Sequence, residues 1–201
     1  MAVLKRDSDY HTYADYLVWS RSHGDELIDG TAWVREPPSP LPAHQIVVGE
    51  IYRQIRNALE GKAARVYCAP FDIRLPKSDE ADDLVDTVVQ PDVFIVSDLQ
   101  KLDARGVRGS PVWLAEVLSP STARHDQVVK LPAYERAGVR EVWLIHPIER
   151  TLRIYLLEGA CYGRETLVEL KGQTQLTAVP DVTVDWDSAL ADIAQLNSGD
   201  D

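Results

Sequence analysis

Two short apolar segments, each carrying one carboxylic acid, restrict the fold of this chain more than any other feature of its sequence. Asp92 begins the run DVFIV, and Glu116 lies near the end of the run PVWLAEV. Both runs are rich in β-branched and aromatic residues and are bounded by Pro, Ser or Asp, as is typical of strands buried on both faces. A carboxylate is rarely buried in a strand unless a partner offsets its lost hydration, and a hard divalent cation is a common partner.

The loop between these two runs indicates how they pair. An antiparallel pair built around SDLQKLDARGVRGS has its axis near Ala104, and Asp92 and Glu116 are equally distant from that axis. The two acids would then face each other, as a shared metal site requires. The loop is also long enough for the register to slip, and Asp92, which follows Pro91, could instead cap a turn at the start of its strand.

The composition is that of one globular domain. The chain has 201 residues, 45% hydrophobic and 26% charged, so we expect a single domain over residues 1–201 that ends in a short helix and polar tail at 187–201. Cys68 and Cys161 lack the spacing of metal ligands, which fits a reducing compartment. No run has the apolar length of a signal peptide or a membrane span. We therefore expect a cytoplasmic protein without a membrane segment.

The charge distribution leaves nucleic-acid binding open. The net charge of −11 argues against it, because phosphate contacts need Lys and Arg. However, residues 79–86 contribute five acids and residues 181–201 contribute six, so the rest of the chain is neutral. Its basic residues form two local groups: Arg53, Arg56, Lys62 and Arg65 in one, and Arg105 and Arg108 in the other. These groups could line a groove or lie on ordinary solvated faces.

Periodicity and turn signals predict an α/β chain. Helical spacing of apolar residues predicts a first helix within residues 8–22 and a longer one over residues 43–59. Between them, residues 25–34 read as a β-hairpin, since Asp29-Gly30 is a strong turn signal between alternating runs. Further along, we expect strands at residues 64–69, 71–75, 93–96, 112–117, 140–145, 152–157 and 165–170, a helix from SPST to Gly138, and a helix at 186–196.

Lys130 is the best candidate for a cation close to the two acids. Hydrolysis of a phosphodiester, which such acids could support, needs a metal and a cation that holds the attacking water. Lys130 follows the second acid-bearing strand and lies four residues after Asp126, so the two share one helical face. Pro132 removes a helical amide and is expected to kink or restart the helix. Alternatively, Lys130 and Asp126 form a surface pair worth only about 0.3–0.5 kcal/mol.

These segments resemble a known family. The run PDVFIVSD, followed by PVWLAEVLSPSTARHDQVVKLPAYERAGVREVWLIHP, resembles the Uma-two family of restriction endonucleases in the PD-(D/E)xK nuclease superfamily. DELIDGTAWV and PLPAHQIVVGEI are similar to the family's glutamate-containing hairpin and its histidine-led first helix. The resemblance covers most of residues 10–157. It implies a central mixed sheet flanked by helices, nuclease chemistry and a divalent metal, usually Mg²⁺, with Mn²⁺ as an alternative.

The resemblance also implies roles for individual residues. Asp92 matches the superfamily's aspartate and Glu116 its second acid, so the two would bind the metal. The strict motif places lysine at position 118, where this chain has Leu118, and the lysine role is taken by Lys130 on the helix, as in this family. A long amine can reach the same point from a neighbouring element. The carbonyl oxygen of Val117 would be a further metal ligand.

Three further residues are accessory candidates. Glu26 and His44 match family positions near the site, and Glu26 could orient a water. Asp126 accompanies Lys130 on the helix. His44 could equally be only a helix-start residue, and His125 and His146 have no ligand-like spacing, so we interpret both as structural or solvent-facing.

The prediction is therefore a metal-dependent endonuclease acting on DNA. Asp92 and Glu116 would hold Mg²⁺, and Lys130 would position the attacking water and stabilise the transition state. The alternative is a catalytically silent, nuclease-like module that binds nucleic acid or protein, although an inactive copy would be expected to lose one of the three charged residues. Cutting both strands needs two sites, so a homodimer is an open expectation.

Overall fold

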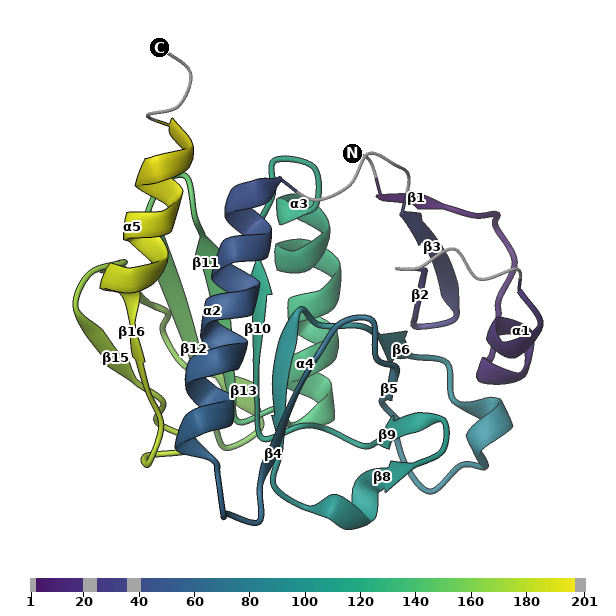
Figure 1. Ribbon diagram of the computed structural model, residues 1–201. Helices are drawn as coiled ribbons and strands as arrows, with labels where there is room; N and C mark the ends of the chain where they lie inside the picture. Colours follow the sequence, from purple (N-terminus) through teal and green to yellow (C-terminus); the bar gives the residue numbers. More distant parts are fainter. Residues whose placement is uncertain (1–2, 20–24, 36–40, 198–201) are drawn as a thin grey trace.

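The computed structural model describes residues 3–19, 25–35 and 41–197 (Figure 1). Its largest element is a mixed sheet with helices on both faces, and a second sheet lies beside it. The order of strands in the central sheet is β13-β12-β11-β10-β7-β4, and β14 also pairs with β12. The strands are β4 (Arg65–Cys68), β7 (Val93–Val96), β10 (Trp113–Val117), β11 (Glu141–His146), β12 (Thr151–Glu158), β13 (Cys161–Tyr162) and β14 (Thr166–Glu169).

The central sheet is mixed because one of its connections crosses over. β10 and β11 are parallel, whereas β10 pairs antiparallel with β7 and β11 antiparallel with β12. Parallel neighbours need a crossover, and the helical segments between β10 and β11 supply it. The predicted central mixed sheet flanked by helices, with an N-terminal helix and hairpin, is therefore confirmed.

The register of the acid-bearing strands agrees with the sequence prediction. Trp113 pairs with Ile95 and Ala115 with Val93, so each pair is centred on residue 104. One further step along the same ladder places positions 116 and 92 opposite each other. Because side chains alternate between the faces of a strand, Asp92 and Glu116 belong to the same face of the sheet.

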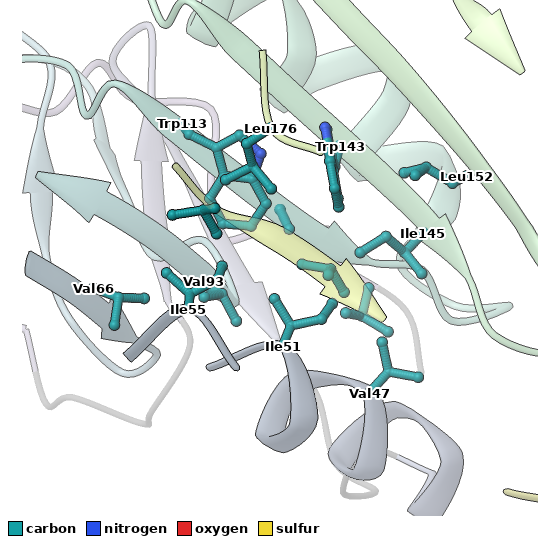
Figure 2. Close-up of a cluster of buried hydrophobic side chains, with 14 of the residues drawn as sticks. Val47, Ile51, Ile55, Val66, Val93, Trp113, Trp143, Ile145, Leu152 and Leu176 are labelled. Carbon is teal, nitrogen blue, oxygen red and sulfur yellow. The ribbon is translucent and has the colours of Figure 1, made fainter. Parts of the chain in front are cut away.

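The opposite face of the sheet is covered by α2 (Pro42–Ala58) and α5 (Trp186–Asn197), which lie side by side (Figure 1). Figure 2 shows the α2 side chains directed at the sheet. This core contains Val47, Ile51, Ile55, Val66, Val93, Trp113, Trp143, Ile145, Leu152 and Leu176. The helix predicted over residues 43–59 is confirmed to within one residue at each end, because its apolar spacing matches the helical period.

The face that carries the two acids is covered by one helical segment with three parts. It consists of α3 (Ala123–His125), a π-helical turn η3 (Asp126–Lys130) and α4 (Leu131–Ala137). The turn is π-helical because the Leu131 N–H donates to the carbonyl of Asp126, five residues earlier. Pro132 has no N–H to continue the regular pattern, which explains why the helix restarts here as predicted. Gly138, with φ of 78°, ends it.

The second sheet contains short strands in the order β1-β3-β2-β6-β5-β9-β8. They are β1 (Val3–Lys5), β2 (Glu26–Ile28), β3 (Thr31–Arg35), β5 (Ile73–Arg74), β6 (Val88–Val89), β8 (Leu102–Asp103) and β9 (Gly106–Arg108). The predicted hairpin turn is confirmed, with φ of 50° at Asp29 and 72° at Gly30, the positive values that a type I′ turn requires.

A short link joins the two sheets at the position of the first acid. Gln90, Pro91 and Asp92 are the only residues between β6 of the second sheet and β7 of the central sheet. Because β6 pairs with β2, this link also brings the β2–β3 hairpin close to the central sheet. Asp92 therefore lies where the two sheets meet.

Other elements differ from the predictions. The first helix, α1 (Tyr13–Val18), is shorter than predicted because Thr12 is its N-cap, and the Thr12 N–H donates to Asp15 at 2.8 Å. Residues 20–24, which include the end of the first helix predicted within residues 8–22, lie outside the described residues, as do the proline-rich residues 36–40 and the tail at 198–201. The sequence did not indicate the strands β15 (Gln173–Gln175) and β16 (Thr183–Asp185) or the 3₁₀ turns η1 (Asp82–Leu84) and η2 (Leu99–Lys101).

The helices in the described parts of the chain do not include one with both the length and the apolar character that a bilayer crossing requires.

Glu50 connects the two helices of the α2–α5 layer. Its carboxylate accepts hydrogen bonds from Arg53 at 2.6 Å and Gln54 at 2.9 Å on α2, and from Ser188 on α5 at 2.5 Å. The hydrogen bond from Arg53, with those from Ser188 and Gln54, outweighs partial burial and lowers the pKa of Glu50 from 4.5 to about 2. The folded state therefore favours the ionised form of this side chain.

We expect Glu50→Gln to lower the free energy of unfolding by about 1–2 kcal/mol at pH 7. The pKa of Glu50 is lower in the folded than in the unfolded state, so its stabilisation is present above about pH 4.5 and is lost as the pH falls toward 2. Urea unfolding between pH 7 and pH 3 should show the difference from wild type shrinking. The exposed Glu60→Gln variant is the control. A difference that stays constant or grows as the pH falls contradicts the prediction.

Candidate active site

The structure brings all the acids and the lysine singled out in the sequence to one buried place. Glu26 comes from β2 of the second sheet, Asp92 from the link between the sheets and Glu116 from β10. Asp126 and Lys130 come from the two ends of the π-helical turn. All five side chains are buried. The site is therefore built from both sheets and from the crossover helix.

Lys130 lies at the centre of this cluster. Its Nζ is 2.9 Å from Glu26 Oε1, 2.6 Å from Glu116 Oε1 and 3.8 Å from Asp126 Oδ1. The side chain is fully buried, so the alternative of a surface pair with Asp126 is wrong. The π-helical turn and the restart at Leu131 set the direction in which Lys130 leaves the helix.

The carboxylate of Asp92 contacts residues of β10 and α2 rather than the backbone of a turn at the start of its own strand. Its Oδ2 accepts the Val117 N–H at 2.8 Å, and its Oδ1 lies 3.5 Å from His44 Nε2. His44 Nδ1 lies 2.9 Å from the Val117 carbonyl, and because a carbonyl oxygen only accepts, Nδ1 is the donor. Burial opposes ionisation of Asp92, but His44, the charge of Lys130 and the Val117 amide together hold its pKa below its ordinary value.

Two residues that the sequence did not assign to the site contact its acids. Tyr134 OH donates a hydrogen bond to Glu116 Oε1, and His125 Nε2 lies 3.2 Å from Glu26 Oε2. His125 is buried, so a solvent-facing position is wrong, whereas a structural position is consistent with this contact. The spacing of Tyr134, four residues after Lys130, was the one available signal, because i and i+4 residues share a helical face.

Burial and mutual repulsion raise the pKa values of the acids around Lys130. Loss of hydration raises the pKa of Glu116 to about 8; the positive charge of Lys130 opposes this shift, and the negative charges of Asp126, Asp92 and Glu26 add to it. Burial likewise raises the pKa of Asp126, again against the effect of Lys130. The cluster thus holds more carboxylates than cations, and an additional cation would be stabilised there.

The donor atoms at the site fit a hard cation such as Mg²⁺ in chemical type. Asp92 and Glu116 offer carboxylate oxygens, and Val117 offers a peptide oxygen on the same strand as Glu116. Asp126 Oδ1 is buried and accepts no hydrogen bond within the described residues. No group of three or more His, Cys, Asp or Glu side chains in those residues is arranged to hold a metal. An ion here would therefore depend on two carboxylates, a peptide oxygen and water, which suits Mg²⁺.

The basic groups singled out in the sequence are largely balanced by acids. Arg53 bonds Glu50 at 2.6 Å on one helix. Lys62 lies 2.9 Å from Asp181, Arg108 lies 3.0 Å from Asp82, and Arg105 lies 3.9 Å from Asp83. These pairs favour ordinary surface faces over a basic groove. Asp82 of the acidic loop also pairs with the fully buried Arg74, so the loop stabilises the second sheet.

Together, the mixed sheet, its flanking helices and the buried Asp–Glu–Lys cluster define a restriction-endonuclease-like protein. The family model Uma2, described as "Putative restriction endonuclease", matches residues 13–191, so the chain belongs to this family. The fold is similar to that of a crystal structure described as a putative nuclease belonging to DUF820 from Anabaena variabilis ATCC 29413. The two chains are 16% identical, with a TM-score of 0.70 over 90% of this chain and 97% of the other. No curated protein matches the chain.

Proposed function

We propose that this protein is a metal-dependent endonuclease that hydrolyses phosphodiester bonds in DNA. Membership of a family described as restriction endonucleases, and a fold shared with a protein described as a nuclease, support nuclease activity. The observation that carries the proposal is the position of Lys130. Its Nζ is 2.6 Å from Glu116, and Glu116 lies one register step beyond the Ala115–Val93 pair, opposite Asp92. An aspartate, a glutamate and a lysine from three elements thus belong to one buried cluster.

The proposed chemistry divides between a metal and the side chains. Asp92, Glu116 and the Val117 carbonyl oxygen would hold Mg²⁺ or Mn²⁺, and the bound ion would supply Lewis acidity toward the scissile phosphate. Lys130 contributes a positive charge on a fully buried side chain, where it stabilises charge that develops on the phosphate more strongly than it would in bulk water. It also holds the attacking water by hydrogen bonding.

The remaining side chains position these groups. Glu26 forms an ion pair with Lys130 at 2.9 Å and accepts the Gln90 N–H at 3.0 Å, so it fixes the ammonium relative to the link that carries Asp92. Tyr134, whose pKa burial and the nearby acids raise well above its ordinary value, remains a neutral donor and fixes Glu116. His44 bridges Val117 and Asp92, which sets the separation of two proposed metal ligands.

Cleavage of supercoiled plasmid DNA tests the proposal. We expect the purified protein to nick or linearise the plasmid with Mg²⁺ or Mn²⁺, to lose this activity when EDTA removes the metal, and to regain it when excess Mg²⁺ is restored. Calorimetric titration of Mg²⁺ gives an independent readout of metal binding. Failure to cleave with either metal, or cleavage that EDTA leaves unchanged, would contradict the proposal. A shift of DNA mobility without cleavage would favour the alternative of a silent binding module.

A further inference from the structure

A cavity of about 400 Å³ lies beside the candidate active site. It is bounded by α1 and the residue that follows it, by the segment between β4 and β5, and by the turn between β8 and β9. Its walls combine aromatic and polar side chains. The aromatic ones are Tyr16, Trp19 and Phe71, and the polar ones include Asp25, Asp72, Gln90, Asp103 and Arg105. Its volume lies in the range of sites that hold small organic groups.

The aromatic walls are fixed by their own contacts. Tyr16 and Trp19 pack edge to face with ring centroids 5.3 Å apart, and the Arg6 guanidinium lies 4.8 Å from the centroid of Trp19. Phe71, which also lines the cavity, packs against Tyr67 with centroids 4.9 Å apart. Aromatic rings held in place in this way offer preformed faces on which a flat ring can stack.

The polar lining selects hydrogen-bond donors. Asp72 Oδ1 accepts from Tyr16 OH at 3.0 Å and from Gln90 Nε2 at 2.7 Å, which fixes the carboxylate in the wall. Asp25 and Asp103 add two more carboxylates, of which Asp103 is also paired with Arg74 at 2.6 Å, and among the described residues of the lining Arg105 contributes a guanidinium. An ionised carboxylate only accepts hydrogen bonds, so this lining disfavours phosphate and favours groups that carry N–H donors. The exocyclic amines of nucleobases are such donors, whereas the one N–H on the pairing edge of thymine lies between two carbonyl oxygens that a carboxylate repels.

The cavity and the active site share part of their walls. Gln90, whose side chain bonds Asp72 in the cavity, donates its backbone N–H to Glu26 at 3.0 Å in the active site. Asp25 immediately precedes Glu26 in β2, and Gln90 is two residues before Asp92. A strand whose phosphate reached Asp92 would therefore pass the residues that connect the active site with the cavity.

We infer that this cavity binds one unstacked nucleobase of the substrate strand and prefers a base with an exocyclic amine over thymine. The inference rests on the proposed function, because it assumes that the strand passes the active site. Stacking on an aromatic wall and access to the amine require a base that is not paired within a duplex, so single-stranded or flipped bases are the ligands.

Binding of labelled dodecamers of deoxycytidine and of thymidine tests the inference. Fluorescence anisotropy with Ca²⁺ in place of Mg²⁺ should show the deoxycytidine strand binding about tenfold more tightly than the thymidine strand. In Asp72→Asn the amide oxygen can still accept from Tyr16 and Gln90, but an N–H₂ group replaces one acceptor, so this ratio should fall close to one. Trp19→Leu should weaken both strands by about tenfold, because it removes a stacking face.

Asp79→Asn is the matched control, since it makes the same change of charge on an exposed side chain outside the cavity lining. It should keep the wild-type ratio. Equal binding of the two strands by wild type, an unchanged ratio in Asp72→Asn, or an equal loss in Asp79→Asn would each refute the inference. Failure of this inference is distinguishable from failure of the proposed function. Metal-dependent plasmid cleavage without base preference refutes only the proposed base binding by the cavity. Base preference without cleavage refutes only the proposed nuclease activity.

Discussion

Replacement of Lys130 by methionine is expected to lower the free energy of unfolding by about 3–5 kcal/mol in metal-free buffer. Methionine has a similar length and can fill the same buried space, so the main change is the loss of charge. Glu26 and Glu116, which lie 2.9 and 2.6 Å from the ammonium, would remain buried without it. The variant therefore leaves uncompensated carboxylates in the interior.

The destabilisation by Lys130→Met should also depend on pH. Without the lysine, buried acids such as Glu116 have folded-state pKa values raised above their unfolded ones, so their contribution favours folding at low pH and is lost as the pH rises through the folded pKa. The deficit relative to wild type should therefore be larger at pH 8 than at pH 5. Urea unfolding at the two pH values measures both effects.

The matched control for this prediction is Lys62→Met. Lys62 also pairs with a carboxylate, at 2.9 Å from Asp181, but both side chains are exposed to solvent. Its loss should change the free energy of unfolding by less than about 1 kcal/mol. If Lys130→Met were no more destabilising than Lys62→Met, or if its deficit shrank as the pH rose, the ammonium would not be what stabilises this cluster.

Asp92→Asn is expected to reduce the rate of plasmid cleavage at least about a hundredfold. The amide oxygen of asparagine can still accept the Val117 N–H, which Asp92 accepts at 2.8 Å, so the link between the strands is kept. What is lost is the negative charge that the proposed metal needs. Single-turnover cleavage assays at saturating Mg²⁺ measure the rate, and calorimetry should show weaker Mg²⁺ binding.

Asp98→Asn is the control for the loss of one aspartate charge. Asp98 caps η2 by accepting from the Gln100 N–H at 3.0 Å, and asparagine caps a helix about as well, so this variant should cleave at the wild-type rate. Thermal unfolding establishes whether each variant is folded. A folded Asp92→Asn that cleaves within a few-fold of wild type would show that Asp92 is not required, and the proposed metal site would be wrong.

The sequence predicted the elements that are marked either by a long periodic pattern or by a local turn signal. The helix of α2 follows from apolar residues at helical spacing, and the β2–β3 hairpin follows from Asp29-Gly30. The β7–β10 register was predicted from loop symmetry about residue 104, and it holds because the strands meet through a loop that contains its own short hairpin, β8–β9.

Much of the second sheet could not be predicted. The strand predicted at residues 71–75 contains β5, but β6 and β8 have only two residues each, which is too short for an alternating pattern to be recognised. β5 and β9 are parallel and distant in sequence, so their pairing depends on tertiary contacts. The true start of α1 was missed because the capping pair Thr12 and Asp15 lies inside the apolar pattern that suggested an earlier start.

The candidate site was predicted in part. Asp92, Glu116 and Lys130 were singled out because charged residues interrupt or follow buried strands, and the structure places them together with Glu26, His44 and Asp126. His125 and Tyr134 were missed. Their hydrogen bonds to acids on other elements depend on how the crossover helix packs on both sheets, and no spacing in the sequence specifies that packing.

Because of the π-helical turn, the number of residues in the crossover helix matters for the site as much as the identity of its charged residues. Successive residues of a helix are rotated by about 100°, so deleting one residue between Asp126 and Lys130 to give a regular α-helix would swing the amine to a different side of the helix axis. Insertions and deletions of single residues here should thus be as rare among active homologues as substitutions of the charged residues themselves.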